Sequence, residues 1–223
     1  MLGIIGGTSL LFSKLPDLEK KTVYTPYGNT EVMCGNIALL LRHQRNTPPH
    51  RINFRGQMSA LAILGVDRLV AIGSAGSLKS AIVPGSLIIP TDFISMTTIP
   101  SMYDHSIKHV HPGLPAGFAG ELKKAVPEAS LGGIYIQTPG PRIETVAEVR
   151  ALSYVADIVG MTLASEATLA IELGIEFAAL CTVDNYANGL ADETLTYEGI
   201  VEHAGLYRER TDLIIEQIIA HFA

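Results

Sequence analysis

Residues 1–11 read MLGIIGGTSLL, an apolar strand that runs directly into two glycines and two hydroxyl side chains. Glycine lets the backbone turn without a steric penalty and brings its N–H groups close to a ligand, while the hydroxyls of Thr8 and Ser9 offer further hydrogen bonds. Strands and helices alternate along the rest of the chain, which is typical of an α/β fold. In such a fold, a glycine turn after a strand is either an anion site or an ordinary turn.

The spacing of the glycines limits which anion this turn can hold. Gly3, Gly6 and Gly7 do not give the G-x-G-x-x-G spacing of a dinucleotide loop, and no acidic residue closes a second strand about twenty residues later. No Lys-Ser or Lys-Thr follows the glycines, which excludes the loop that binds nucleoside triphosphates. The turn therefore predicts a site for a small oxyanion.

The composition predicts one globular domain over residues 1–223. Hydrophobic residues make up 48% of the chain and charged residues 17%, which is enough apolar material for a sizeable core. The low charge also favours a homo-oligomer, in which another subunit covers part of the surface. The net charge of −6 gives no electrostatic surface for nucleic acid or an anionic membrane, so an anionic ligand must be held locally.

Cysteine and histidine give no sign of a disulfide framework or a metal site. Cys34 and Cys181 are isolated in the sequence and are interpreted as apolar thiols. His105, His109 and His111 lie in a loop segment without a partnered carboxylate pattern and are interpreted as loop residues, so we expect no metal and no cofactor. The chain starts on its first strand without a basic leader, and no apolar run approaches roughly 18 residues, so we expect a cytoplasmic protein.

Strand, loop and helix recur along the chain. We expect a hairpin over residues 31–41, with its turn at Gly35-Asn36 and a second arm buried on both faces. Residues 12–29 are expected to be turn-rich, and residues 91–115 to form a long loop. Further strands are expected at residues 69–72, 87–89, 133–137, 157–159 and 177–183, and helices at residues 54–64, 118–125, 165–173, near Thr145 and from Tyr197 onward.

Polar residues follow five of these strands. In an α/β sheet the functional residues collect beyond the carboxyl ends of the strands, so we expect these five positions to converge. They are Thr8, Arg42-His43, Gly73-Ser74, Met161-Thr162 and Asn185.

Several of these side chains have a structural explanation beside a functional one. Arg42 is either a surface ion-pair partner or a guanidinium fork for an anion, with His43 as a further donor. Thr162 is either a helix N-cap or a ligand contact, and Ser74 is either a turn residue or a ligand contact. Glu144 follows a Pro-Gly-Pro-Arg turn and either suits the first turn of a helix or accepts an N–H from a ligand.

Six ordered motifs resemble those of the purine nucleoside phosphorylase and methylthioadenosine phosphorylase family. The resemblance runs from residue 3 to about residue 215, and it is specific because all six motifs occur together and in order. It is closer to the methylthioinosine and 6-oxopurine nucleoside phosphorylases than to the animal enzymes. The motifs are IIGGT at residues 4–8, TPYG at 25–28, RH at 42–43, PPHRINFR at 48–55, GPRIET at 140–145 and VGMT at 159–162.

The resemblance implies a single-domain α/β fold with a mixed, partly closed β-sheet flanked by helices, assembled as a homotrimer or a dimer of trimers. It implies phosphorolysis, in which inorganic phosphate is a co-substrate that attacks the anomeric carbon of a purine nucleoside. The products are the free base and a ribose 1-phosphate. Developing positive charge on the sugar is stabilised by a phosphate dianion held nearby, and no metal is needed for that.

The resemblance also implies a role for individual residues. Asn185, Glu144 and His43 are the implied catalytic residues. The implied phosphate contacts are Thr8, Arg42, His43, Gly73, Ser74 and Thr162. The implied nucleoside contacts are Ile143, Glu144, Met161, Asn185, Tyr197, Ile200, Val201 and, from the neighbouring subunit, His111.

Asn185 and Glu144 together predict the purine. A 6-oxopurine presents O6 as an acceptor and N1–H as a donor, which matches an amide and a carboxylate. Adenosine-type members of the family carry Asp at the position of Asn185 and another Asp where this chain has Ala187. We therefore expect phosphorolysis of inosine, guanosine or 5′-methylthioinosine.

Three alternatives stay open on the sequence. They are a 5′-methylthioadenosine phosphorylase, a nucleosidase that uses water, and a non-catalytic purine-binding protein of the same fold. The 5′ substituent is open as well, because Tyr197 suits a hydroxyl or a methylthio group, or only caps the last helix.

Overall fold

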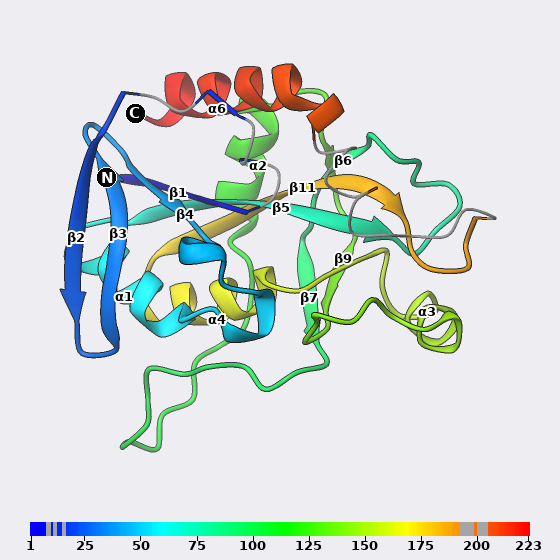
Figure 1. Ribbon diagram of the computed structural model, residues 1–223, viewed down its shortest axis with the longest axis horizontal. Coiled ribbons are helices and arrows are strands. Elements are labelled where there is room, and N and C mark those ends of the chain that lie inside the picture. The colour runs from blue at the N-terminus through cyan, green and yellow to red at the C-terminus, as the bar shows by residue number, and fades with distance from the viewer. Residues whose placement is uncertain (8–9, 11–12, 15–16, 192–198, 200–204) are drawn as a thin grey trace.

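The apolar stretch at the start of the chain forms β1 (Leu2–Gly6), which runs through the interior of the sheet (Figure 1). The structure is a computed structural model that describes all residues except 8–9, 11–12, 15–16, 192–198 and 200–204. β1 pairs in parallel with β4 (Ala38–Leu41) on one side and with β5 (Arg68–Ser77) on the other. All of β1 is buried, as a strand covered on both faces requires.

The sheet is mixed and open. Its strands follow the order β2-β3-β4-β1-β5-β10-β9-β7, and a branch from β5 continues through β11 and β6 to β8. The other strands are β2 (Glu19–Thr25), β3 (Gly28–Cys34), β6 (Leu87–Ile89), β7 (Asp92–Ser95), β8 (Ser130–Leu131), β9 (Ile134–Gln137), β10 (Ile158–Gly160) and β11 (Glu176–Tyr186). The expected mixed α/β sheet is confirmed, but its strands do not close on themselves within the described residues.

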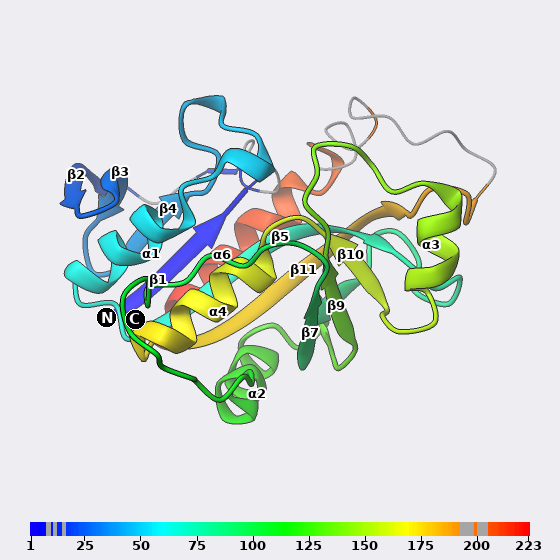
Figure 2. The same cartoon turned by 90° about the horizontal axis from the view of Figure 1, so that it is seen from below.

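Helices cover both faces of the sheet (Figures 1 and 2). α1 (Phe54–Ile63) and α4 (Leu163–Leu173) bury their apolar sides in one core cluster, on one face. α2 (Ala116–Ala125) and α6 (Arg208–Phe222) do so in a second cluster, on the other face. α3 (Val146–Leu152) packs beside β9 and β10 in a third, smaller cluster. Two short 3₁₀ turns, η2 (Gln44–Asn46) and η3 (Pro49–Arg51), follow β4.

The helices begin and end where local chemistry favours it. Asn53 caps α1 by accepting a hydrogen bond from the Gly56 N–H, and Thr145 caps α3 in a capping box with Glu148. Gly174 ends α4 with φ of 71°, a left-handed conformation that glycine adopts at low cost. The apolar stripe of α6 is core, as expected, because Ile214, Ile215 and Ile218 are buried against the sheet.

The expectation of a turn-rich segment over residues 12–29 is wrong, because β2 lies within it. β2 pairs antiparallel with β3 along its full length. It is an edge strand, and Val23 is its only buried side chain. Its two lysines are typical of an edge that must not pair with another chain. The strand was missed because a polar, exposed edge lacks the apolar pattern of buried strands.

Three other strands, β3, β5 and β11, are longer than expected, and two strands, β7 and β8, were not expected. β5 continues through Gly73-Ser74 to Ser77 in parallel pairing with β11, so these small residues are strand and not a loop. β11 likewise continues through Asn185 to Tyr186, with a register shift after Val183. β7 starts the segment that was expected to be a long loop, and it pairs with β9. Backbone pairing with a neighbouring strand outweighs the weak strand propensity of glycine and serine here.

The described residues offer little chemistry apart from the site described below. Cys34 is half-buried and Cys181 is buried, both are free thiols, and burial raises the pKa of each. No group of three or more potential metal ligands occurs in the described part of the chain. None of the helices described is long and apolar enough to cross a lipid bilayer.

Candidate functional site

A cavity of about 520 Å³ lies where the ends of β4, β5, β10 and β11 meet. The turn before α3 and the segment after β4 complete its wall. The expected convergence of strand ends is confirmed for Arg42, His43, Ser74, Met161, Thr162 and Asn185, which all line this cavity. Its polar lining residues are Arg42, His43, Asn46, Thr47, Ser74, Glu144, Thr162, Asp184 and Asn185, and its other lining residues include Ile143, Val159, Met161 and Ala187.

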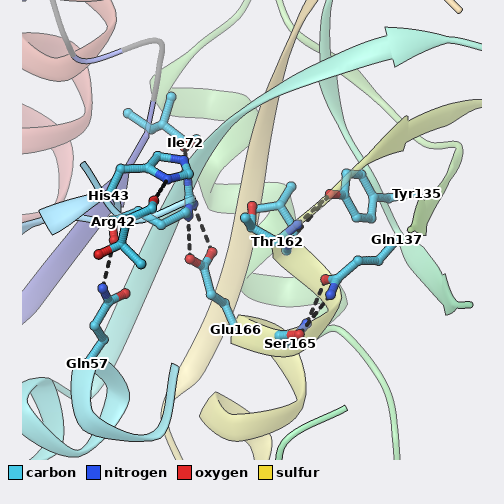
Figure 3. A network of polar contacts seen from close by, with 11 residues as sticks. Arg42, His43, Gln57, Ile72, Tyr135, Gln137, Thr162, Ser165 and Glu166 are labelled. Carbon is cyan, nitrogen blue, oxygen red and sulfur yellow. Dashed lines mark hydrogen bonds and ion pairs between the residues drawn. The ribbon is translucent and has the colours of Figure 1, made fainter. Parts of the chain in front are cut away.

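Arg42 is neither a surface residue nor a free cation. Its side chain is 2% exposed and forms a bidentate ion pair with Glu166 of α4, which is 0% exposed. Nε donates to Oε1 over 2.5 Å and Nη2 donates to Oε2 over 2.8 Å (Figure 3). Burial alone would lower the pKa of the Arg42 guanidinium, but the Glu166 carboxylate beside it holds that pKa above its usual range. The Arg42 guanidinium therefore keeps its positive charge.

One edge of the Arg42 guanidinium stays open toward a ligand. A guanidinium has five N–H bonds. Nε–H and one Nη2–H bond Glu166, and one Nη1–H bonds the Ile72 carbonyl over 3.1 Å. Among the described residues, one N–H on each Nη has no hydrogen-bond partner, and Arg42 lines the cavity. Two N–H donors on neighbouring guanidinium nitrogens suit two oxygens of a phosphate or carboxylate.

Gly7 lies against this open edge. A Cβ at Gly7 would stand 2.7 Å from Arg42 Nη1 and 3.2 Å from His43 Nε2. Two nitrogens that follow β4 thus approach the same point beside the turn after β1. Glycine is required here because any side chain would occupy the space between the turn and these nitrogens.

Gly7→Ala should weaken the binding of a small oxyanion by about tenfold or more, because the paired Arg42 cannot move away from the new methyl group. Calorimetric titration of the protein with sodium sulfate measures the effect. Gly120→Ala is the matched control, since a Cβ at this position in α2 meets nothing within 4 Å. Equal sulfate affinities in the Gly7→Ala variant and the unchanged protein would mean that no anion binds beside Gly7.

His43 is held in one tautomer. Its Nδ1 lies 2.8 Å from the Thr47 carbonyl oxygen, which only accepts, so Nδ1 carries the proton. Burial lowers the pKa of His43 below its usual range. The hydrogen bond to Thr47 opposes this shift, and the positive charge of Arg42 adds to it. The ring is therefore neutral near pH 7, with a bare lone pair on Nε2.

Ser74 and Thr162 complete the polar wall opposite His43. Ser74 Oγ is buried and has no hydrogen-bond partner in the part of the chain that the structure describes. Thr162 stands at the N-cap of α4, but its side chain makes no capping bond. Both hydroxyls line the cavity. An unpaired buried hydroxyl is costly, so a ligand that bonds it is favoured.

Three of the backbone N–H groups at the start of α4 donate to side chains of β9. Tyr135 Oη accepts from the backbone N–H groups of Thr162 and Leu163 over 3.2 and 3.4 Å (Figure 3). Gln137 Oε1 accepts from the Ser165 N–H over 2.9 Å, and Gln137 Nε2 donates to Ser165 Oγ over 2.8 Å. An anion here is therefore held by side chains more than by the helix terminus.

Glu144 is fixed as an acceptor. Its carboxylate is 7% exposed, and Oε1 accepts from the Thr138 hydroxyl over 2.5 Å. Asn188, which follows β11, donates to the Glu144 carbonyl over 3.0 Å and ties this turn to the end of that strand. Because the hydroxyl uses one carboxylate oxygen, the other is left for an N–H of a ligand.

Asn185 lies at the end of β11, on the same wall. One Nδ2–H donates to the Tyr186 carbonyl over 2.8 Å, which leaves Oδ1 and the second N–H for a ligand. Gly76 of β5 faces it, with a hypothetical Cβ 3.3 Å from Asn185 Nδ2. Because Gly76 has no side chain, the Asn185 amide fits beside β5 at this position.

Some of the residues that the sequence singled out lie elsewhere. Thr8, Tyr197, Ile200 and Val201 are outside the described residues. Gly73 lies next to Ser74, but its carbonyl accepts from Thr182 over 3.5 Å, and Gly73 is not among the lining residues. His111 is exposed in the segment between β7 and α2, and it does not line the cavity of its own chain.

Several residues of the site escaped the sequence analysis. Glu166 has the clearest signal, since it is a single carboxylate within the apolar first two turns of α4. Tyr135 and Gln137 belong to β9, and Thr138 follows it; the sequence predicted a strand here and assigned none of its side chains to the site. Asn188 gave no signal. Each of these side chains acts on a partner that lies far away in the chain or in another element.

Comparison with known proteins gives matches over nearly the whole chain. The family model described as the phosphorylase superfamily matches residues 1–220. An Archaeoglobus fulgidus protein named probable 6-oxopurine nucleoside phosphorylase is 39% identical, over 98% of this chain and 96% of that protein. A Methanocaldococcus jannaschii protein named probable S-methyl-5′-thioinosine phosphorylase is 36% identical, over 98% of this chain and 92% of that protein. Among solved structures, a methylthioadenosine phosphorylase from an antarctic soil metagenomic library has a TM-score of 0.84 and 27% identity, covering 98% of this chain and 85% of that one.

Proposed function

Because the chain belongs to the phosphorylase superfamily, we propose that it catalyses phosphorolysis of 6-oxopurine nucleosides. The substrates are inosine, guanosine or 5′-methylthioinosine, and the products are the free purine and ribose 1-phosphate or its methylthio analogue. One observation carries the proposal: a single cavity joins an anion-binding wall, with Arg42 and Ser74, to a base-binding wall, with Glu144 and Asn185.

The anion-binding wall suits phosphate as the nucleophile. The open edge of Arg42 binds two phosphate oxygens, and the hydroxyls of Ser74 and Thr162 bind others. A phosphate oxygen forms a bond to C1′ of the sugar while the bond from C1′ to N9 of the purine breaks. The dianion stabilises the positive charge that develops on the sugar as the base departs.

The base-binding wall suits the purine that leaves. The electron pair of the broken bond moves into the purine ring, and N7 takes up a proton that balances the one hydrogen phosphate gives up. The free N–H of Asn185 then donates to O6, and its Oδ1 accepts from the N7–H. Glu144 accepts the N1–H, which only a 6-oxopurine carries. Met161 lines the same cavity, with its sulfur beside Gly140, and the family resemblance assigns it to packing beneath the sugar.

The tautomer of His43 gives the site a preference among anions. Hydrogen phosphate can donate its own O–H to the bare Nε2 of neutral His43, whereas sulfate has no proton to donate. We expect sulfate binding to strengthen as the pH falls, because protonation of His43 places a donor on Nε2. The pKa of His43 is below its usual value, so the gain amounts to up to about tenfold per pH unit until the pH reaches that pKa.

Calorimetric titration with sulfate at several pH values measures this effect. His43→Gln is the control, because the glutamine side chain does not titrate and the pH dependence should disappear. Sulfate affinity that is constant with pH in the unchanged protein would show that His43 does not contact the anion.

The function itself is tested by assaying inosine, guanosine, adenosine and their 5′-methylthio analogues with and without phosphate. We expect cleavage of the 6-oxopurine nucleosides that depends on phosphate. Faster cleavage of 5′-methylthioadenosine than of inosine, guanosine and methylthioinosine would contradict this proposal and indicate a 5′-methylthioadenosine phosphorylase instead. Cleavage without phosphate would indicate a nucleosidase, and binding without turnover a purine-binding protein.

The remaining assignments are expectations of the same proposal. Thr8, Tyr197, Ile200 and Val201 are assigned to the phosphate and the 5′ end of the nucleoside by family resemblance. His111 is assigned to the site of a neighbouring subunit in a homotrimer or a dimer of trimers. The place of the enzyme is the cytoplasm, and its role is purine salvage.

A further inference from the structure

We propose that Glu166 is a positioning residue that presents the open edge of Arg42 to phosphate. The inference rests on the proposed function, in which that edge binds the attacking anion. Glu166 does not line the cavity itself. It acts through Arg42, by occupying one edge of the guanidinium so that only the other can face a ligand.

The contacts around Arg42 define one orientation of its guanidinium. Glu166 holds the edge formed by Nε and Nη2, and the Ile72 carbonyl of β5 holds Nη1 (Figure 3). The backbone is held too, since Gln57 Nε2 of α1 donates to the Arg42 carbonyl over 2.7 Å. A long side chain with this many fixed contacts loses little freedom when an anion arrives, which favours binding.

The position of Glu166 in α4 links two phosphate contacts. Glu166 follows Thr162 by four residues, and its N–H donates to the Thr162 carbonyl over 3.3 Å. Residues four apart lie on the same side of a helix. The bonds from Gln137 and Tyr135 anchor this first turn to β9. This first helical turn thereby fixes the position of the Thr162 hydroxyl. Through Glu166, it also fixes the orientation of the Arg42 guanidinium.

A simpler role for Glu166 would be to neutralise a buried cation. The two roles predict opposite effects when Gln replaces Glu166. Loss of the negative charge alone would make the site more positive and tighten phosphate binding. Loss of the positioning contact weakens it, because the glutamine amide accepts at one atom only and turns an N–H toward the second N–H of Arg42.

Two variants at this position separate charge from geometry. Glu166→Gln keeps the shape and removes the charge, while Glu166→Asp keeps the charge and is too short for the same bidentate contact. We expect each to raise the KM for phosphate at least about tenfold, with the KM for the nucleoside within about twofold of the original. Glu172→Gln is the matched control on the same helix, because Glu172 bonds Ser101 and the Met102 N–H, away from the cavity.

The outcomes are distinct. A lower KM for phosphate in Glu166→Gln, or an unchanged one in Glu166→Asp, would overturn the positioning role. If Glu166→Gln does not fold, the KM for phosphate of Glu166→Asp still tests the positioning role, because this variant keeps a negative charge beside the buried Arg42. Calorimetric titration with phosphate is run on all variants without nucleoside. If the unchanged protein cleaves no nucleoside, the proposed function fails, while the titration still tests how Glu166 affects anion binding.

Discussion

Arg42→Met should lower the free energy of unfolding by about 3–5 kcal/mol and reduce phosphate-dependent turnover by about 10³-fold. The loss of stability follows from the partner, because the substitution leaves the Glu166 carboxylate fully buried without a cation. The loss of turnover follows from the guanidinium edge that faces the cavity, because the described lining residues include no other arginine or lysine. Urea unfolding and steady-state kinetics measure the two effects separately.

A double variant separates stability from chemistry. Arg42→Met combined with Glu166→Leu replaces the buried ion pair by apolar side chains, and such replacements are often neutral or stabilising. We expect the double variant to regain most of the lost stability and none of the turnover. An unfolding midpoint of Arg42→Met equal to that of the unchanged protein would contradict the burial argument. Recovery of turnover in the double variant would remove Arg42 from the phosphate site.

Asn185→Asp should shift the substrate preference from inosine toward adenosine, with a change in the ratio of their kcat/KM values of about 10² or more. The aspartate carboxylate accepts the amino N–H of adenine and repels O6 of a 6-oxopurine, because both are acceptors. The ratio is measured because it is insensitive to a partial loss of folded protein.

The control for this variant carries the same change in charge. Asn29→Asp places an aspartate in β3, outside the cavity that contains Asn185. We expect it to leave the substrate ratio unchanged. If the ratio of kcat/KM for inosine and adenosine is unchanged in Asn185→Asp itself, Asn185 does not determine which purine the site accepts.

Buried strands could be predicted from the sequence and exposed ones could not. The second arm of the hairpin, β4, is a run of apolar residues, and the burial of the strand on both faces explains that run. β2 has one buried side chain and pairs through its backbone, so its residues carry no periodic signal. The end of β5 resembles a turn in sequence because it is rich in glycine and serine, and two of these residues, Ser74 and Gly76, line the cavity as well as pairing in the sheet.

The positions of the site could be predicted better than the contacts that fix them. Arg42, Thr162 and Asn185 follow apolar strands, and the topology of the sheet brings such ends together. Glu166 lies 124 positions from Arg42 in the chain, so neither local sequence predicts that the two side chains form an ion pair. The alternative of a surface ion pair for Arg42 is wrong, because the residue makes a buried ion pair with Glu166. The alternative of a guanidinium fork for an anion stays a prediction, for the edge that Glu166 does not occupy.

Phosphate as the nucleophile is the central claim, and the products of inosine cleavage test it most directly. The purified protein is incubated with inosine in phosphate buffer and in phosphate-free buffer, and hypoxanthine, ribose 1-phosphate and free ribose are quantified. We predict equal amounts of hypoxanthine and ribose 1-phosphate with phosphate present, and no cleavage without it. Release of free ribose in the phosphate-free buffer, at a rate that added phosphate does not change, would contradict the account.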